Sequence, residues 1–306
     1  MADYLTFGDI VTDVGRAIKQ YQTTTDAKAL IKSVINQVYL QEILQADKLY
    51  PLFWLLTLND SRRSVASCSV TGITQASPGV VSADHDFVVG DIVTLYSIGG
   101  MTEANNRTYK VGTVVAGTSF QLLDLTGANV DTTLYTAYTS GGTAVHRGIT
   151  LASPVTKMVK GGVNWHGHSP MVEIDPVALE AGEDQDWWNS GTGLPERFMH
   201  YKQFAAAGTE TDMMLWFPGA QQVDYLRYWA QKNVARLAAD ANVPQLPWMF
   251  HDAITAGAIV RLGESDVQVE NQVIWPTIYR NHLDAIVNYN RDWWEKQQTL
   301  GKPYLL

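Results

Sequence analysis

The chain has 306 residues, of which 46% are hydrophobic and 17% are charged, and its formal net charge at pH 7 is −9. This composition supplies enough apolar material for a sizeable core and too little charge for a disordered protein. The acidic balance argues against a protein that wraps nucleic acid, which would carry a basic face. It is compatible with a wall past which DNA slides, because acidic groups repel phosphates.

The length predicts about two domains. No apolar run reaches the roughly 18 residues that span a bilayer, and the first residues lack the basic and apolar segments of a signal peptide. Cys68 is the single cysteine, so no disulfide can form within one chain, and we expect synthesis in a reducing compartment. The ten Trp and fourteen Tyr indicate extensive contacts between subunits.

Two helices are predicted near the N-terminus. Thr6, with Asp9 three residues later, opens the first, which we expect to reach about Tyr21. Thr25 or Asp26 caps the second, which we expect to reach about Ala46. The apolar positions of the first are Ile10, Val14 and Ile18; those of the second are Ala27, Leu30, Ile31, Val34, Ile35, Val38 and Tyr39. The apolar segment Leu49–Leu58 reads as a buried strand or as a helix end, and Pro51 favours a break.

A β-rich module is predicted between residues 65 and 147. Short runs of β-forming residues alternate there with Gly, Asn and Asp turns about every ten residues, a pattern typical of a small barrel or sandwich. The predicted strands are Ser67–Thr74, Ile92–Ser97, Arg107–Val115, Ser119–Leu123 and Thr143–His146. The pairs Gly99-Gly100 and Asn105-Asn106 are expected at turns, where positive φ is easy.

The rest of the chain is predicted to be first β and then helical. The expected strands are Pro154–Val159, Pro170–Ile174, Glu196–Ala205, Asp212–Phe217 and Val223–Gln231, with a Gly- and Asp-rich loop over Gly182–Pro195. A helix over Pro247–Leu262 has Phe250, Ile254, Ala258 and Leu262 at helical spacing. A last long helix begins within Asp266–Pro276 and ends near Gln298, and Pro276 either starts or kinks it.

The predicted fold class is α+β. A helical bundle formed by the N- and C-terminal helices, with β-strands, makes one domain over residues 1–64 and 148–306. A small β-barrel over residues 65–147 is inserted into it, leaving and returning at nearby points.

The insert resembles a β-barrel domain of phage tail and connector proteins, which is named for its likeness to the first catalytic-cysteine half-domain of ubiquitin-activating enzymes. The residues that carry this resemblance are His85-Asp86-Phe87, Gly90-Asp91-Ile92-Val93, Gly99-Gly100-Met101, Asn105 to Val111, Ser119-Phe120-Gln121-Leu122 and Tyr138 to Gly142. The resemblance implies a fold and a phage setting. It does not imply ubiquitin chemistry, because Cys68 lies at the edge of the module.

The flanking segments, roughly Leu5–Leu58 and Pro195–Gln297, resemble phage head-to-tail adaptor proteins, which dock under the portal ring. The resemblance rests on the order of elements: two N-terminal helices, then the segments Pro195 to Phe198, Leu215 to Pro218, Leu226 to Trp229, and Leu246 to Ile254 with Gly257-Ala258. Similar adaptors commonly form twelve-subunit rings on the portal.

Signatures of catalysis and cofactor binding are missing from the sequence: no GxxxxGK[ST], GxGxxG between strand and helix, GxSxG or HExxH occurs. His166 and His168, with Glu173 or Asp175, could ligate a metal, but a polar loop is the favoured interpretation. Glu183, Asp184 and Asp186 depart from calcium-loop spacing, so a solvated loop or an interface anchor is favoured. Trp165, Trp187 and Trp188 could stack on sugars, although buried or subunit-contact aromatics are favoured. No specific pair of carboxylates marks a glycosidase; such partners can lie far apart in a sequence, so this alternative stays open.

The candidate interface residues are Trp187, Trp188, Trp293, Trp294, Tyr304, Leu305 and Leu306. Adjacent helical residues point about 100° apart, so Trp293 and Trp294 cannot both face one core, and at least one is predicted to contact another subunit or partner. The segment Leu300–Leu306 is predicted either to dock on a neighbouring chain or to fray into solvent.

We therefore expect a structural head-to-tail adaptor of a tailed phage, located at the head–tail junction of the virion and assembled in the host cytoplasm. Its expected partners are the portal protein, other tail proteins such as a nozzle, stopper or fibre, and further copies of itself in a ring, twelve by the resemblance. Packaged DNA would pass without specific binding; no cofactor, metal, membrane or catalysis is expected. The alternatives are a stopper or tail completion protein, a glycan-binding or depolymerising tail protein and, least favoured, a host-encoded soluble enzyme.

Overall fold

The computed structural model describes residues 4–18, 25–63, 67–151, 155–165, 170–174, 192–204, 210–220, 224–265, 267 and 269–299. The chain is α+β and divides into two compact units. Unit 1 comprises Met1–Leu56 and Gln231–Lys302, and unit 2 is built from Thr57–Ala230. Unit 1 therefore combines an early and a late stretch of the chain.

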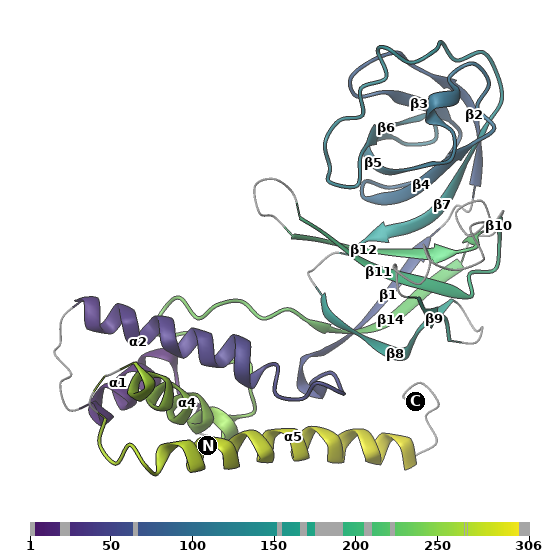
Figure 1. The fold of residues 1–306 in the computed structure, drawn as a ribbon. Coiled ribbons are helices and arrows are strands. Elements are labelled where there is room, and N and C mark those ends of the chain that lie inside the picture. The colour runs from purple at the N-terminus through teal and green to yellow at the C-terminus, as the bar shows by residue number, and fades with distance from the viewer. Residues whose placement is uncertain are drawn as a thin grey trace. The chain divides into compact units, whose positions relative to one another are not determined.

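Unit 1 contains four α-helices among its described residues. They are α1 (Phe7–Ala17), α2 (Thr25–Gln37), α4 (His251–Glu264) and α5 (Trp275–Thr299), accompanied by the π-helix η1 (Val38–Ile43) and the 3₁₀ segments η2 (Phe53–Leu55) and η5 (Trp248–Phe250). Figure 1 shows these helices, with α5 as the longest. None of the helices that the structure describes is long and apolar enough to cross a membrane.

The start of α1 is as predicted, and its end is not. The Thr6 hydroxyl accepts a hydrogen bond from the Asp9 amide at 3.2 Å, and the Asp9 carboxylate accepts one from the Thr6 amide at 2.9 Å, which completes a capping box. The prediction that this helix reaches Tyr21 is wrong. It ends at Ala17, because Ile18 takes an extended conformation and forms an isolated antiparallel bridge with Val269.

The second helix runs on from α2 into η1, so the chain is helical to Ile43, three residues short of the predicted end. Most of its predicted apolar stripe faces the core, and Ile31, Ile35 and Val38 are buried. Leu30 was placed in that stripe wrongly, since its side chain is 51% exposed.

The C-terminal helices follow the sequence pattern closely. The four apolar residues predicted to share one face of α4, from Phe250 to Leu262, are all buried. The helix itself begins at His251, after the 3₁₀ turn of η5. Pro276 is the second residue of α5 and so opens the helix, where its missing amide hydrogen costs nothing.

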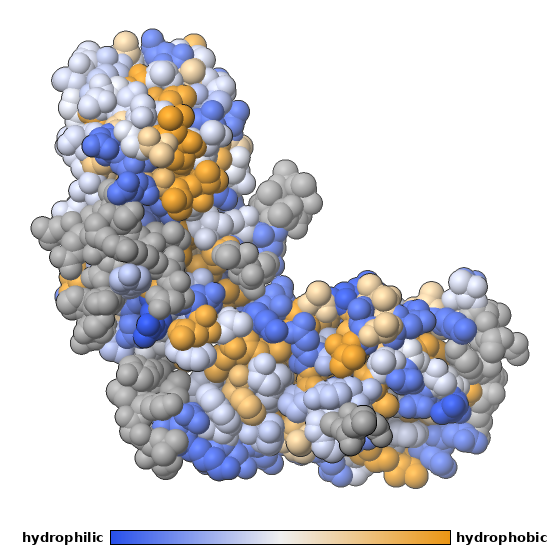
Figure 2. All heavy atoms as spheres, turned by 180° about the vertical axis from the view of Figure 1, so that it is seen from behind, coloured by the Kyte–Doolittle hydropathy of each residue, from blue (hydrophilic) through white to orange (hydrophobic). Residues whose placement is uncertain are grey.

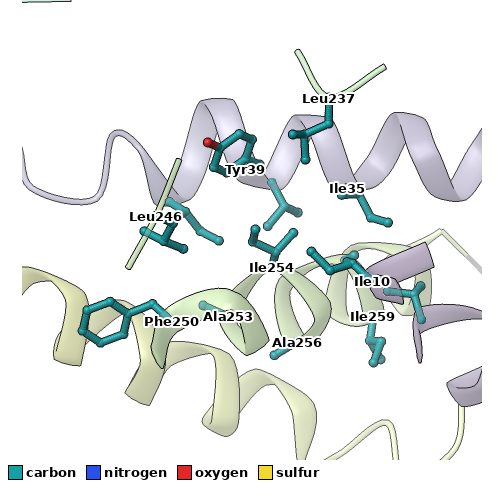
Figure 3. Packing of buried hydrophobic residues seen from close by; sticks show 14 of the residues in the cluster. Ile10, Ile35, Tyr39, Leu237, Leu246, Phe250, Ala253, Ile254, Ala256 and Ile259 are labelled. Atoms are coloured by element: carbon teal, nitrogen blue, oxygen red, sulfur yellow. The ribbon is translucent and has the colours of Figure 1, made fainter. Parts of the chain in front are cut away.

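The core of unit 1 draws on all four helices. Figure 3 shows Ile254 of α4 pointing toward Ile35 and Tyr39 of the α2–η1 helix, with Ile10 of α1 beside them. Tyr39 is fully buried, and its hydroxyl accepts a hydrogen bond from the Gln245 amide at 2.6 Å. Burial raises the pKa of Tyr39 to about 12, so the hydroxyl stays protonated at neutral pH.

Helix α4 lies very close to two neighbours at Gly257. A Cβ atom at this position would lie 2.5 Å from Val38 Cγ1 and 2.7 Å from Tyr279 Cε2. These are far inside normal carbon–carbon contact distances. Glycine is therefore what allows α4 to lie against both η1 and α5.

The strands of unit 2 fall into three sheets. They are β1 (Leu56–Arg63), β2 (Ser67–Ile73), β3 (Val80–Ala83), β4 (Asp91–Tyr96), β5 (Arg107–Val115), β6 (Ser119–Leu123), β7 (Thr143–Thr150), β8 (Val155–Trp165), β9 (Val172–Glu173), β10 (Thr192–Gly193), β11 (Arg197–Phe204), β12 (Glu210–Phe217), β13 (Gly219–Ala220) and β14 (Asp224–Lys232). Strand β1 begins one residue before unit 2, and β14 ends two residues after it.

The predicted small β-barrel is confirmed. Six strands follow the order β2-β3-β6-β5-β4-β7, and β2 also pairs with β7, which closes the sheet on itself. The bounds predicted for β5 and β6 agree with the structure, whereas the four-residue strand β3 was missed. The predicted turns are present: Gly100 has a φ of 81° and Asn106 a φ of 57°. Figure 2 shows apolar residues gathered in a band along one face of the barrel.

Strand β7 pairs with a strand outside the barrel as well as with β4 inside it. Its last residues, Gly148 to Thr150, pair with β12, which pairs in turn with β11. The imidazole of His146 stands between the two packed regions, 5.7 Å from the ring of Phe87 on the barrel side and 4.9 Å from that of Trp216. The sequence places the insert at 65–147, and the compact unit that contains the barrel is wider, because the nine-stranded sheet continues from β7 through β12 and β11 to β9.

The remaining predicted strands are all present with shifted bounds. The strand expected to end at Val159 continues as β8 to Trp165, and β11, β12 and β14 lie within two residues of their predicted starts. A separate sheet has the order β1-β14-β8. The segment predicted as either a strand or a helix end contains both the short helix η2 and the start of β1.

Candidate functional site: an aromatic surface on unit 1

Four aromatic side chains from η2 and α5 form one partly exposed cluster on unit 1. We call Phe53, Trp54, Tyr289 and Trp293 the aromatic surface. The rings of Phe53 and Trp293 stack with centroids 4.8 Å apart and planes 6° apart, and Phe53 lies 5.4 Å from Tyr289. Trp54 lies edge-on to Phe53 at 5.1 Å. Tyr289 is 39% exposed and the other three are partly buried, so the cluster offers ring surface to a partner.

A buried polar network fixes the backbone beneath this surface. The Asn290 side chain accepts a hydrogen bond from the Phe53 amide at 3.1 Å and donates one to the Asp47 carboxylate at 3.0 Å. Asp47 also accepts the amides of Leu49 and Tyr50. Because Asn290 and Asp47 are both almost fully buried, these bonds are shielded from water and hold η2 against α5.

Trp294 is part of the support and not of the surface. It is 2% exposed, its indole nitrogen donates to the Pro51 carbonyl at 2.8 Å, and its ring stacks on Tyr50. The indole of Trp293 meets it edge-on at 5.0 Å. Of the adjacent pair Trp293 and Trp294, only Trp293 therefore retains exposed surface.

A second polar cluster holds the other half of α5. Glu42 of η1 accepts hydrogen bonds from Arg261 of α4 at 2.8 Å and from the Tyr279 hydroxyl of α5 at 3.0 Å. Burial raises the pKa of Tyr279, and the negative charge of Glu42 raises it further. Three helices are thereby tied together at one carboxylate, which makes α5 a firm base for the aromatic surface.

Two further exposed side chains adjoin Phe250, a residue that contacts the aromatic surface. Trp248 and Met249 of η5 are 50% and 45% exposed, and they directly precede Phe250, whose ring lies 5.4 Å from Tyr289. Aromatic and Met side chains of this kind are enriched where proteins bind one another. The chemistry that this arrangement offers is binding through apolar and aromatic contact.

The other candidate residues are placed as follows. Trp187, Trp188, Tyr304, Leu305 and Leu306 lie outside the described residues, as do both histidines of the possible metal site and the acidic residues of the possible calcium loop. Within the described ranges, no three His, Cys, Asp or Glu side chains come together as a metal site.

Two residues singled out in the sequence are buried in unit 2. Trp165 is 1% exposed and its ring lies 5.2 Å from that of Trp216. The favoured interpretation, a buried aromatic, is therefore confirmed for this residue, and stacking on a sugar is excluded. Cys68 is 8% exposed, and burial raises the pKa of its thiol to about 12. A thiol in that state is a poor nucleophile.

Sequence reasoning missed Phe53, Trp54 and Tyr289. Two signals were present: an adjacent Phe-Trp pair directly before a strand, and the four-residue spacing of Tyr289 and Trp293, which places them on one side of a helix. Neither signal reveals that the two segments meet, because they are more than 200 residues apart in the chain.

Comparison of the sequence with protein-family models and with curated proteins found no match. No family is therefore assigned to the chain, and its function has to be argued from its own residues.

Proposed function

We propose that this chain is a structural head-to-tail adaptor of a tailed bacteriophage. In this role, copies of the chain form a ring under the portal protein, extend the DNA channel and carry tail components, without catalysis or a cofactor. The number of copies, twelve in adaptors of this kind, comes from the resemblance described above. The place of action is the head–tail junction of the virion.

The observation that carries the proposal is the aromatic surface on unit 1. It is partly exposed, held in place by a buried hydrogen-bond network, and formed by residues from the early and the late stretch of unit 1. We take unit 1 as a helical bundle of N- and C-terminal helices whose role is to contact other subunits. A rigid aromatic patch loses little side-chain entropy on binding, which suits a permanent assembly.

The distribution of charge supports a channel role for the other unit. Unit 1 holds 14 of the 31 acidic and 12 of the 22 basic residues, a net −2, whereas unit 2 holds 17 and 10, a net −7. An acidic surface near a channel repels DNA phosphates and keeps the DNA from adhering as it passes.

The closed barrel supports a role as a platform. Because β2 pairs with both β3 and β7, the six strands of the barrel leave no unpaired edge along that closure. Closed sheets resist edge-to-edge association. We take the barrel as a stable module that braces the ring or carries further tail parts.

The test is native mass spectrometry of the purified chain, alone and mixed with the portal protein of its phage. The expected result is a complex that contains a ring's number of copies and forms with that portal but not with the portal of an unrelated phage. If the chain forms no complex with the portal of its own phage, the adaptor role is contradicted and a stopper or tail completion protein is favoured.

A further inference from the structure

The paired strands β11 and β12 of unit 2 carry a cluster of four ionisable side chains that the proposed function does not use. His200 and Lys202 lie on β11, and Glu210 and Asp212 lie on its antiparallel partner β12 (Figure 1). Lys202 and Asp212 are directly opposite each other in the register, so their side chains project from the same face of the sheet. The cluster therefore brings an amine and a carboxyl group together across two strands.

The carboxylate of Asp212 is the fixed centre of this cluster. Its side chain is completely buried, with an exposed fraction of 0%, and its Oδ2 atom accepts a hydrogen bond from the Val155 amide at 2.6 Å. Its Oδ1 atom lies 3.1 Å from His200 Nε2 and 2.9 Å from Lys202 Nζ. Burial holds the pKa of His200 below its ordinary value, although the charge of Asp212 opposes this effect. The imidazole is therefore neutral at pH 7, and its Nε2–H donates to the carboxylate. Both oxygens of Asp212 are held, so the group cannot turn away from the lysine.

The amine of Lys202 is bound to two carboxylates at once. It also pairs with Glu210, and the side chains of Lys202 and Glu210 are 35% and 27% exposed. Burial lowers the pKa of Lys202, but the hydrogen bonds to Glu210 and Asp212 outweigh that effect and raise the pKa above its ordinary value. The group is therefore an ammonium at neutral pH. It is the cation that balances the two carboxylates, and in the part of the chain that the structure describes these groups do not form a metal site.

The cluster contains the parts that amide formation requires. The amine lies against the carboxyl group that it would attack, and the Val155 amide donates to the oxygen on which negative charge develops during the attack. Glu210 is bound to the same amine and can carry its proton. Groups held in place in this way react as if their concentration were roughly 10⁵ M or more. Burying two opposite charges is also costly, and an amide removes both charges.

We propose that Lys202 and Asp212 become joined by an amide bond between Nζ and Cγ, which links β11 and β12 covalently within one chain. One proton of the ammonium passes to Asp212 Oδ1, and the freed amine attacks Cγ. A second proton passes through Glu210 to the same oxygen, and Glu210 returns to its carboxylate form. The bond between Cγ and Oδ1 then breaks and Oδ1 leaves as water. One ammonium and one carboxylate thus yield one amide and one water, without an oxidant or a further reactant.

The bond is expected to form slowly, after the chain has folded. The ammonium of Lys202 has to lose a proton before it attacks, and its two carboxylate partners make that loss harder. His200 acts as a positioning residue, because it holds the oxygen that leaves. Strand β12 also pairs with β7 of the barrel, so the bond would fix the strand pair that lies beside the barrel. This inference does not depend on the adaptor role.

The test is the intact mass of the full chain, measured at purification and again after incubation at neutral pH for several days. The wild type is expected to be lighter than its sequence by one water molecule, at once or after incubation. Digestion with trypsin locates the change, because trypsin does not cleave after a lysine whose amine is part of an amide. Residues 198–227 are therefore expected as one peptide that lacks one water. A cyclic imide at Asp212 would lose the same water but would leave Lys202 open to cleavage.

Three variants identify the groups that react. Lys202→Arg keeps a cation beside Asp212 but has no amine that forms the bond, so it is expected to keep its full mass. Glu210→Gln is expected to slow the loss of water about a hundredfold or more. Glu196→Gln removes an exposed carboxylate just before β11 and is the matched control, which should react like the wild type. Circular dichroism checks that the variants fold, and Lys202→Gln replaces Lys202→Arg if the latter does not.

Two results would overturn the amide bond. One is a wild type that keeps its full mass or is still cleaved completely after Lys202. The other is a loss of water in Lys202→Arg at the rate of the wild type, which would place the reaction elsewhere in the chain. If Glu210→Gln forms the bond as fast as the wild type, proton transfer through Glu210 is overturned.

Discussion

Replacing Gly257 with alanine should destabilise unit 1 through a single added methyl group. The new Cβ would lie 2.5 Å from Val38 Cγ1 and 2.7 Å and 2.8 Å from two ring carbons of Tyr279. Normal contact is about 3.5–4.0 Å, so neighbours on two sides must move by about 1 Å. Both neighbours belong to elements that are fixed by other contacts, so neither can yield without cost.

The magnitude follows from two opposing terms. Alanine forms helix better than glycine by about 1 kcal/mol, whereas overpacking a core costs about 1–3 kcal/mol, and contacts this short favour the upper end. We expect a net loss of about 2 kcal/mol in the free energy of unfolding of unit 1. For a unit of this size that corresponds to a melting temperature roughly 5–10 °C lower.

Gly263→Ala in the same helix is the matched control. A Cβ there meets only the end of the flexible Gln272 side chain, at 3.1 Å, so alanine should be neutral or stabilise by about 0.5 kcal/mol. Far-ultraviolet circular dichroism during thermal unfolding reports mainly on unit 1, because the four described α-helices all lie in it. Equal melting temperatures for Gly257→Ala and the wild type would refute the close approach of α4 to its neighbours.

Three further predictions concern buried polar groups. Asn290→Ala removes the acceptor of the Phe53 amide and one of the donors to the buried Asp47 carboxylate, which should cost about 2–3 kcal/mol by the same melting assay. The exposed Asn288→Ala should cost nothing measurable, and equal effects would contradict the network. Burial holds the pKa of His251 below its ordinary value of 6.5, and its Nδ1 accepts the Leu5 amide, so protonation disfavours the fold. Unit 1 should therefore be fully stable above about pH 6.5 and lose stability as the pH falls below it, and His251→Gln should flatten that dependence; an unchanged slope would argue against His251 as its source. With a thiol pKa of about 12, Cys68 should react with a thiol reagent more than about a hundredfold more slowly in the native protein than in the unfolded chain, and equal rates would show that the thiol is accessible.

Sequence patterns predicted correctly those features that depend only on residues close together in the chain. The capping box at Thr6 and Asp9 and the turn glycines of the barrel follow from the conformations that single residues adopt, and the sequence identifies them directly. Strand β3 was missed because four residues behind a Pro-Gly pair are too short for a periodic signal.

The errors arise where distant segments compete for a residue. Ile18 continues the apolar spacing of α1, yet it leaves the helix to pair with Val269, about 250 residues later. Leu30 fits the stripe of α2 by spacing alone, but the core of unit 1 does not extend over it. The aromatic surface was missed for the same reason: each half is visible in the sequence, but the hydrogen bond from the Phe53 amide to Asn290 that joins them is not.

Because unit 1 is divided between two distant stretches of sequence, it can fold only late in synthesis. At a translation rate of about 5–20 residues per second, Trp293 is added on the order of ten to fifty seconds after Leu56. During that interval unit 2 can fold, while α1 and α2 await the helices that cover their apolar faces. The aromatic surface exists only after α5 has joined η2. A chain that is terminated before α5, or whose α5 is still on the ribosome, therefore lacks the aromatic surface.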